Sequence, residues 1–328
     1  MSIDKEEFMA QVSKEWHKPF TKKFKRSKVI SLGIDDVWGA DLVDMQEWEA
    51  QNDGYKYMLN VVDVFSRFAW SEPLKTKSAK EVLDAFKKIV SEAHKPPIRF
   101  WVDQGTEFYN SSMKAYLKKT GTVMYSTFGE HKVANVERFN RTLKTVMWKE
   151  FTRKSTRRWI TMLPGLIKSY NNTVHRSLFG LTPQKAYSFD KKQETALWTK
   201  QYGDAINERG QSKPKFAIGD TVRISRSKNI FEKGYLPNWS NELFQIVSII
   251  HDEPIRYKIK DLHGSGEVLE GSFYTEELQK VKYPDVWLVD EVLKRRTVKG
   301  TKQLFVRWLG LSKKYDSWIN EADTVLLK

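Results

Sequence analysis

A carboxylate directly after a short apolar segment constrains the fold of this chain more than any other feature. Residues 99–102 alternate and are rich in bulky apolar side chains, Gly105 interrupts the pattern, and a helical pattern follows. This order predicts that Asp103 lies at the open end of a strand. Since α/β folds place their chemistry at that edge of the sheet, we expect a functional carboxylate there.

Two further acids complete a candidate site. The apolar segment around Asp41 reads as a buried strand, where an uncompensated carboxylate is costly. Glu137 lies on a run with helical apolar spacing, which leaves Arg141 and Lys144 on the face of Glu137. Oxygen ligands of this kind suit two Mg²⁺ or Mn²⁺ ions. Such ion pairs support in-line displacement at phosphorus, which predicts phosphodiester hydrolysis or transesterification.

The motifs around these acids resemble a known family. Asp41, Asp103 in Val-Asp-Gln-Gly-Thr-Glu-Phe, and Glu137 in Asn-Val-Glu-Arg-Phe-Asn-Arg-Thr-Leu-Lys resemble the Asp-Asp-Glu triad of retroviral-type integrases. The resemblance is greatest to integrases of Polinton or Maverick transposons and their virophage relatives, and it extends to residues 57–70 and 170–183. It implies a ribonuclease H-like α/β core with a mixed five-stranded sheet, two bound metal ions, and a homodimer or tetramer.

Residues 35–190 are the predicted integrase catalytic core. Its first three strands should form an antiparallel meander, and Ser78 should cap a helix with Glu81 three residues on. By resemblance, residues 128–134 form a loop that closes over DNA, although this segment could be only a connector. Glu130 is the rival third acid, but it precedes the helical run, so we favour Glu137.

The charge of the chain points to a polyanionic partner. The sequence has 56 Lys and Arg against 41 Asp and Glu, a net charge of +15, which favours double-stranded DNA. No apolar run approaches the roughly 18 residues that span a bilayer, so we expect a soluble, intracellular protein. The expected location is the nucleus, or the host cell nucleus if the protein is viral. The absence of cysteine excludes disulfides and the His-His-Cys-Cys zinc module of many retroviral integrases.

Basic side chains concentrate just beyond the third acid, where residues 138–176 carry ten Lys or Arg and one Glu. Arg223 and Arg226 alternate outward on a later predicted strand, where they either bind DNA backbone or are ordinary exposed strand residues. Phosphate contacts of this kind position a protein on DNA without reading sequence. The candidates for DNA contact are Lys132, Asn140, Arg141, Lys144, Arg223 and Arg226.

The remaining predicted segments are an N-terminal arm, a linker, a barrel and a C-terminal module. Residues 1–34 form a basic arm that either contacts phosphate, directs nuclear import or is a solvated disordered tail, and residues 191–213 form a charged linker. Short alternating strands in residues 214–281 predict a small all-β barrel. Its motifs Lys233-Gly-Tyr-Leu-Pro-Asn-Trp239 and Gly271-Ser-Phe-Tyr274 resemble the Src-homology-like C-terminal barrel of these integrases, which implies DNA binding.

Within residues 283–328, the motifs are Trp287-Leu-Val-Asp-Glu-Val-Leu-Lys-Arg-Arg296, a Val298-Lys-Gly300 turn and Leu304-Phe-Val-Arg-Trp-Leu-Gly310. They resemble a chromodomain, an α+β module. Such modules hold methyl-lysine in an aromatic cage by cation–π attraction. Trp287 and Trp308 fall on two cage positions, but the third is Leu311, so histone-tail binding competes with protein docking or a structural use.

The three acids within motifs that resemble those of retroviral-type integrases imply an integrase that processes DNA 3′ ends and joins them to target DNA. A ribonuclease H-like nuclease that cuts without joining remains an alternative. A non-catalytic chromatin-binding or DNA-binding protein is the other alternative, although a pure binder has no use for three buried carboxylates.

Overall fold

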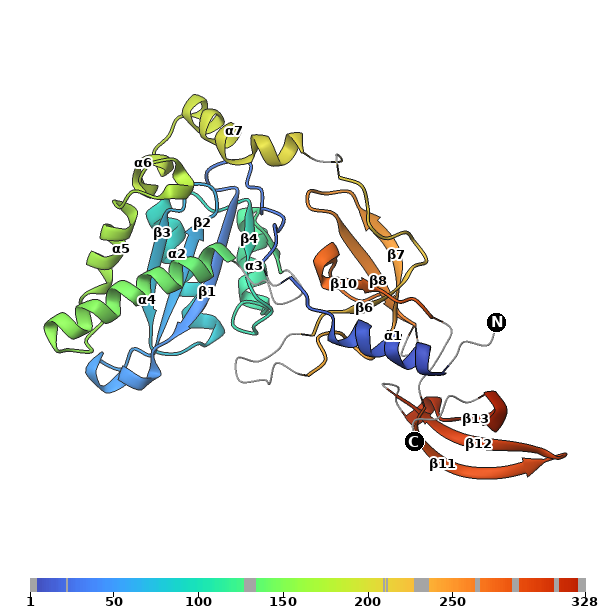
Figure 1. The fold of residues 1–328 in the computed structure, drawn as a ribbon. Helices are drawn as coiled ribbons and strands as arrows, with labels where there is room; N and C mark the ends of the chain where they lie inside the picture. The colour runs from blue at the N-terminus through green and yellow to red at the C-terminus, as the bar shows by residue number, and fades with distance from the viewer. Residues whose placement is uncertain are drawn as a thin grey trace. The chain divides into compact units, whose positions relative to one another are not determined.

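The computed structural model describes residues 5–21, 23–126, 134–208, 210, 212–226, 236–262, 266–284, 289–309 and 313–323. Val29–Asn207 form one compact unit, the inner unit, and Met1–Lys28 with Glu208–Lys328 form the second, the terminal unit (Figure 1). In the described part of the chain, no helix has the length and apolar character needed to cross a membrane.

The inner unit is built on a mixed five-stranded sheet in the order β3-β2-β1-β4-β5. The first three strands are antiparallel, whereas β4 and β5 run parallel to β1. Both the meander and the mixed sheet therefore confirm the prediction from the sequence. The strands are β1 (Val37–Asp44), β2 (Tyr57–Asp63), β3 (Ala69–Leu74), β4 (Arg99–Trp101) and β5 (Val123–Tyr125).

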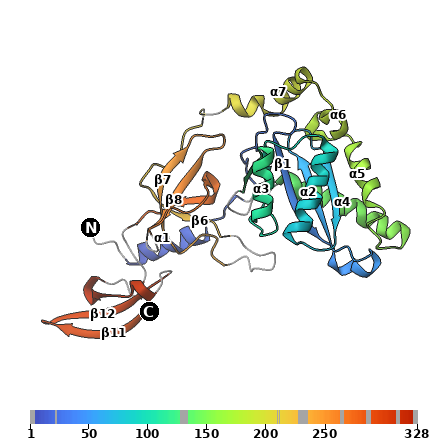
Figure 2. The same cartoon turned by 180° about the vertical axis from the view of Figure 1, so that it is seen from behind.

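Helices cover both faces of this sheet. On one face, Phe86 of α2 (Ala79–Ala93) and Leu117 of α3 (Ser111–Thr120) share an apolar cluster with the strands. On the other, Phe139 of α4 (Ala134–Lys154) and Leu163 of α5 (Leu163–Asn171) share a second cluster. Figure 1 shows α4 across one face, and Figure 2 shows α2 and α3 on the opposite face.

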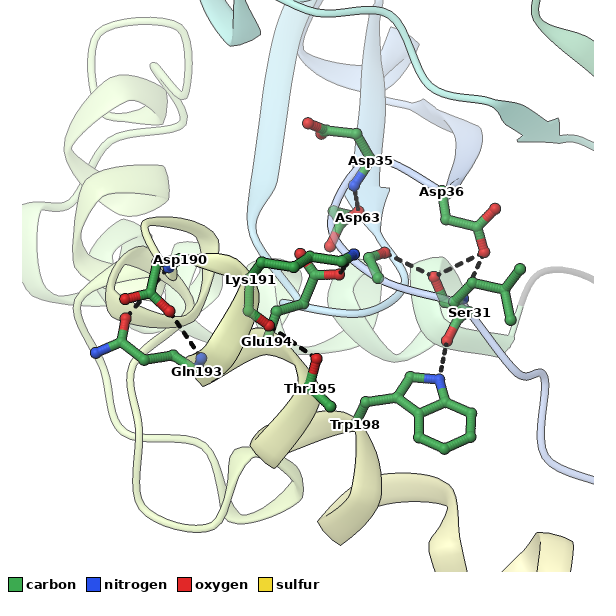
Figure 3. A network of polar contacts seen from close by, with 12 residues as sticks. Ser31, Asp35, Asp36, Asp63, Asp190, Lys191, Gln193, Glu194, Thr195 and Trp198 are labelled. Atoms are coloured by element: carbon green, nitrogen blue, oxygen red, sulfur yellow. Dashed lines mark hydrogen bonds and ion pairs between the residues drawn. The ribbon is translucent and has the colours of Figure 1, made fainter.

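The predicted linker is largely helical, so that prediction is wrong for residues 191–207. There, α7 (Lys191–Asn207) follows α6 (Pro183–Tyr187) and buries Leu197 and Tyr202 in the inner unit. The Trp198 indole N–H also donates to the Ser31 carbonyl at 3.0 Å (Figure 3). The many charged residues of α7 hid its apolar face in the sequence.

The terminal unit contains two antiparallel sheets. Its larger sheet has the order β10-β6-β7-β8-β9, as the prediction of short strands requires, and the smaller has the order β11-β12-β13. The larger comprises β6 (Thr221–Ile224), β7 (Phe244–Ile250), β8 (Arg256–Asp261), β9 (Phe273–Tyr274) and β10 (Leu278–Lys280). The smaller comprises β11 (Val289–Val298), β12 (Thr301–Trp308) and β13 (Ser317–Asn320).

The N-terminal segment is part of the terminal unit rather than a disordered tail. Helix α1 (Lys5–His17) buries Phe8 and Val12. Beyond it, the Trp239 indole donates to the Lys18 carbonyl at 2.7 Å, and the Tyr274 hydroxyl accepts from the Ser27 N–H at 3.1 Å. The tail interpretation is therefore wrong for the described residues of this segment.

Candidate active site

Asp41 lies on β1, and Asp103 lies two residues beyond the end of β4, the neighbouring parallel strand. Gly39 of β1 pairs with Trp101 of β4, and each aspartate lies two residues further along its strand direction. Because side chains alternate across a strand and adjacent strands lie about 4.8 Å apart, both should reach the same face side by side. That face is the one that α4 covers, since Trp101 and Val43 share the apolar cluster of α4.

The turn after Asp103 explains why its sequence context is so specific. The Gly105 carbonyl accepts from the N–H groups of Phe108 and Tyr109, at 3.1 and 2.9 Å. A Cβ at Gly105 would lie 2.4 Å from the carboxyl carbon of Glu107, so a larger residue would displace that side chain. Asn110 then caps α3 by accepting from the Met113 N–H at 2.9 Å. Asp103 thus lies two residues beyond the end of β4, just before a tight turn.

The third acid approaches from α4. Glu137 is exposed in the first turn of this helix. One turn later, the Asn140 amide donates to Asp41 Oδ2 at 2.8 Å, which joins α4 to the carboxylate of β1. Glu137 therefore lies one helical turn before Asn140, the residue that joins α4 to Asp41.

The donor set suits a hard divalent cation, because all three side chains offer carboxylate oxygens. Among the residues that the structure describes, however, no three acidic, histidine or cysteine side chains already form a group able to hold a metal ion. Glu130, the rival third acid, lies outside the described residues. What the structure supplies is two aspartates in matching register and a helix tied to one of them.

The predicted DNA-contact residues of the inner unit fall into three classes. Arg141 and Lys144 are exposed like Glu137, so the shared face expected from the helical spacing is present. Asn140 is only 9% exposed and its amide is engaged with Asp41, which leaves it a role inside the site. Lys132 lies outside the described residues, as does most of the predicted closing loop.

In the terminal unit, the prediction that Arg223 faces outward is wrong. Its side chain is buried, donates to the Ser240 and Asn241 carbonyls at 2.9 Å each, and lies 3.5 Å from the Glu15 carboxylate. Burial lowers the pKa of Arg223, and Glu15 opposes that shift. Arg226, in contrast, is exposed as predicted.

Only part of the predicted methyl-lysine cage can be placed, since Trp287 and Leu311 lie outside the described residues. Trp308 is half-buried at the end of β12, and its indole N–H donates to the Ser317 hydroxyl at 3.0 Å. Nearby on the same sheet, the Arg296 guanidinium lies 4.0 Å from the centre of the Trp318 ring.

Two polar residues that the sequence analysis missed, buried Asn60 and partly buried Ser71, take part in the site. Asn60 on β2 is opposite Asp41 in the register and donates to Asn140 Oδ1 at 2.7 Å. The Ser71 hydroxyl on β3 in turn donates to Asn60 Oδ1 at 2.5 Å. A polar residue inside an otherwise apolar strand was the available signal, because burying an unbonded amide is costly.

Family models agree with this architecture. The model for "Integrase core domain" matches residues 34–127, which include Asp41 and Asp103. The model for "Chromo (CHRromatin Organisation MOdifier) domain" matches residues 287–325.

Curated relatives point to the same class. The chain is 34% identical over 200 residues to a transposon-derived protein of Caenorhabditis elegans, in a match covering 61% of this chain and 65% of that protein. It is 27% identical over 157 residues to the Gag-Pol polyprotein of feline leukemia virus, covering 45% of this chain and 9% of the polyprotein. The chain thus spans less than two-thirds of each relative.

A solved structure shares the fold. A chain in the cryo-EM structure of the simian T-cell lymphotropic virus intasome in complex with PP2A regulatory subunit B56 gamma superimposes with a TM-score of 0.55. The match covers 81% of this chain and 84% of that chain at 11% identity. The HTLV-2 integrase catalytic core domain, solved in complex with magnesium in a dimeric form, gives a TM-score of 0.41 at 18% identity, covering 48% and 99%.

Residues 34–127 thus match the integrase core domain, and the chain is similar to a transposon-derived protein and to a retroviral Gag-Pol polyprotein. The inner unit has the ribonuclease H-like fold of integrase catalytic cores, with a mixed five-stranded sheet. A chromodomain match follows near the C-terminal end.

Proposed function

We propose that this chain is a polynucleotidyl transferase that processes the 3′ ends of a mobile element's DNA and joins them to host DNA. The observation that carries the proposal is the matching register of Asp41 and Asp103 beyond the paired residues Gly39 and Trp101. Support comes from the integrase core match, which includes both aspartates, and from the transposon-derived relative.

In this proposal, Asp41, Asp103 and Glu137 hold two Mg²⁺ or Mn²⁺ ions. When bound, such ions activate the attacking water or 3′-hydroxyl and stabilise the departing oxygen. The chain's own residues orient these carboxylates, and exposed Arg141 and Lys144 bind phosphates of the element's DNA end beside them.

The expected DNA substrate, oligomeric state and cellular location follow from this proposal. We infer double-stranded DNA as substrate and target, and a homodimer or tetramer, because two ends must be joined to one target. The host nucleus is the inferred site of action. The likeness of the acid motifs favours a Polinton or Maverick element or a virophage as the source, and a barrel formed by residues 214–281 would add DNA contacts, including Arg226.

The test is a strand-transfer assay with purified protein, a labelled duplex matching an element end, a plasmid target and Mg²⁺ or Mn²⁺. We expect Asp103→Asn to reduce joining by at least ~100-fold, as loss of an electrostatic group at a reacting centre does. Asp44→Asn is the matched control, because Asp44 is exposed on the same strand as Asp41 and only accepts from Gln46. Cleavage without joining would favour the nuclease, and DNA binding with neither would favour a chromatin-binding protein.

The chromodomain match supports a histone tail as a further partner. The full chain and its Trp308→Ala variant should be titrated with methylated and unmethylated tail peptides. We expect the methylated peptide to bind the unaltered chain more tightly and the variant to lose this preference. Equal or absent binding of the two peptides to the unaltered chain would exclude methyl-lysine recognition.

A further inference from the structure

A row of polar side chains crosses the inner sheet directly beneath α4. Asp41 on β1 is opposite Asn60 on β2, and Asn60 is opposite Ser71 on β3. Residues paired across antiparallel strands project to the same face. This row therefore runs from the third strand to the candidate active site.

The surroundings of the row are apolar. Met58 and Val62, which flank Asn60 on its own face, are at most 1% exposed and pack in one cluster with Phe139 and Leu143 of α4. Asn60 itself is 0% exposed. A buried amide in such a place is costly unless its donors and acceptors are bonded, so its retention requires an explanation.

The hydrogen bonds of the row have one direction. Ser71 donates to Asn60 Oδ1 at 2.5 Å, Asn60 Nδ2 donates to Asn140 Oδ1 at 2.7 Å, and Asn140 Nδ2 donates to Asp41 Oδ2 at 2.8 Å. An amide turned the other way at Asn140 would present its oxygen to the carboxylate and its NH₂ to the NH₂ of Asn60. The contact with Asn60 therefore selects the orientation in which Asn140 donates to Asp41.

We propose that Asn60, held by Ser71, is a positioning residue that acts through Asn140 to fix the Asp41 carboxylate for metal binding. This inference rests on the proposed function, because it requires that Asp41 be a metal ligand. Groups that hydrogen-bond to metal ligands typically change metal affinity or activity by about 10–100-fold when removed. Asn60 is well suited to such a role because it is fully buried and lies beside Asp41 on the neighbouring strand.

The test compares Asn60→Leu with Asn171→Leu in the full chain. Asn171 is also a buried asparagine of the inner unit, but the two hydrogen bonds of its side-chain amide go to the Ala69 backbone on β3. Mn²⁺ binding without DNA is measured by calorimetric titration, and thermal unfolding verifies that each variant is folded. Ser71→Ala is the milder second variant, since it removes only the donor to Asn60.

We expect Asn60→Leu to weaken Mn²⁺ binding about tenfold, and Ser71→Ala to weaken it less. Asn171→Leu should lower the unfolding temperature while leaving Mn²⁺ affinity unchanged. Equal Mn²⁺ affinity in Asn60→Leu and the unaltered chain, or equal weakening in Asn171→Leu, would overturn the inference.

Strand-transfer assays on the same proteins separate this inference from the proposed function. Joining by the unaltered chain together with undiminished Mn²⁺ affinity in Asn60→Leu overturns the positioning role alone. Selective weakening of Mn²⁺ binding in Asn60→Leu without joining by the unaltered chain supports the positioning role and removes the integrase proposal. An unaltered chain that neither binds Mn²⁺ nor joins DNA overturns both.

Discussion

One group of buried polar side chains in each unit illustrates a different arrangement. In the inner unit, neutral Asn60 and Asn140 form a directional row that ends on the half-buried carboxylate of Asp41. In the terminal unit, Glu15 and Arg223 form a charged pair, with each residue at most 5% exposed. The first arrangement orients a carboxylate that we propose to be a metal ligand, whereas the second connects helix α1 to strand β6, which lies far from α1 in the sequence.

Breaking the charged pair should have the largest effect on stability. Arg223→Met leaves the Glu15 carboxylate buried without its cation, so we expect the terminal unit to lose about 3–5 kcal/mol of unfolding free energy. Urea denaturation, monitored by hydrogen exchange of the backbone amides in β6 and β7, measures this loss of unfolding free energy. Arg226→Met, a change to an exposed arginine three residues later, is the control and should change stability by less than about 0.5 kcal/mol. Similar losses in the two variants would refute a special role for the pair.

A buried carboxylate without a cation sharpens the comparison through its pH dependence. Burial raises the pKa of Asp63 from 3.8 to about 7, although Ser66 and the Asp35 N–H donate hydrogen bonds to it (Figure 3). Since the folded protein holds this proton more tightly than the unfolded chain, unfolding free energy should fall between about pH 4 and 7 and level off above that. The expected slope is about 1.4 kcal/mol per pH unit, or on the order of 4 kcal/mol in total.

Urea unfolding of the unaltered chain and of Asp63→Asn across this pH range measures that contribution. The difference in unfolding free energy between the two proteins should change with pH below 7 and stay constant above it. A difference that does not vary with pH would mean that Asp63 titrates normally in the folded protein.

What the sequence predicted, and what it missed, follows the same division. The positions of Asp41 and Asp103 depended on local apolar patterns and a glycine turn, so the sheet, the place of Asp41 within β1 and the place of Asp103 just beyond β4 could be predicted. The burial of Arg223 depends on Glu15, 208 residues earlier in the chain, and no local pattern contains that contact. Asn60 was missed for the same reason, because its partner Asn140 lies on a helix 80 residues later.

The loss of a neutral buried amide should change the unfolding free energy less than the unpairing of the Glu15 carboxylate or the titration of the Asp63 carboxylate. Asn171 accepts from the Ala69 N–H at 3.0 Å and donates to the Ala69 carbonyl at 2.8 Å, so it pairs with the edge strand β3 as another strand would. Asn171→Ala leaves both backbone groups without these bonds, and we expect a loss of about 2 kcal/mol in chemical denaturation. Asn172→Ala removes an exposed amide that donates only to Lys168 and should cost less than about 1 kcal/mol. Equal costs would show that burial does not set the value of these bonds.

An exposed hydrogen bond marks the lower end of this series. The Ser78 hydroxyl accepts from the Glu81 N–H at 3.4 Å at the start of α2, where water can also reach the helix end. Because the freed N–H can bond to water, Ser78→Ala should cost only about 1 kcal/mol. Thermal unfolding measures this cost. Ser91→Ala, near the other end of the same helix and also exposed, should be close to neutral in that experiment. Ser78 is exposed and Arg223 is buried. If Ser78→Ala lowered the unfolding free energy as much as Arg223→Met, solvent exposure would have little effect on what such polar groups contribute to stability.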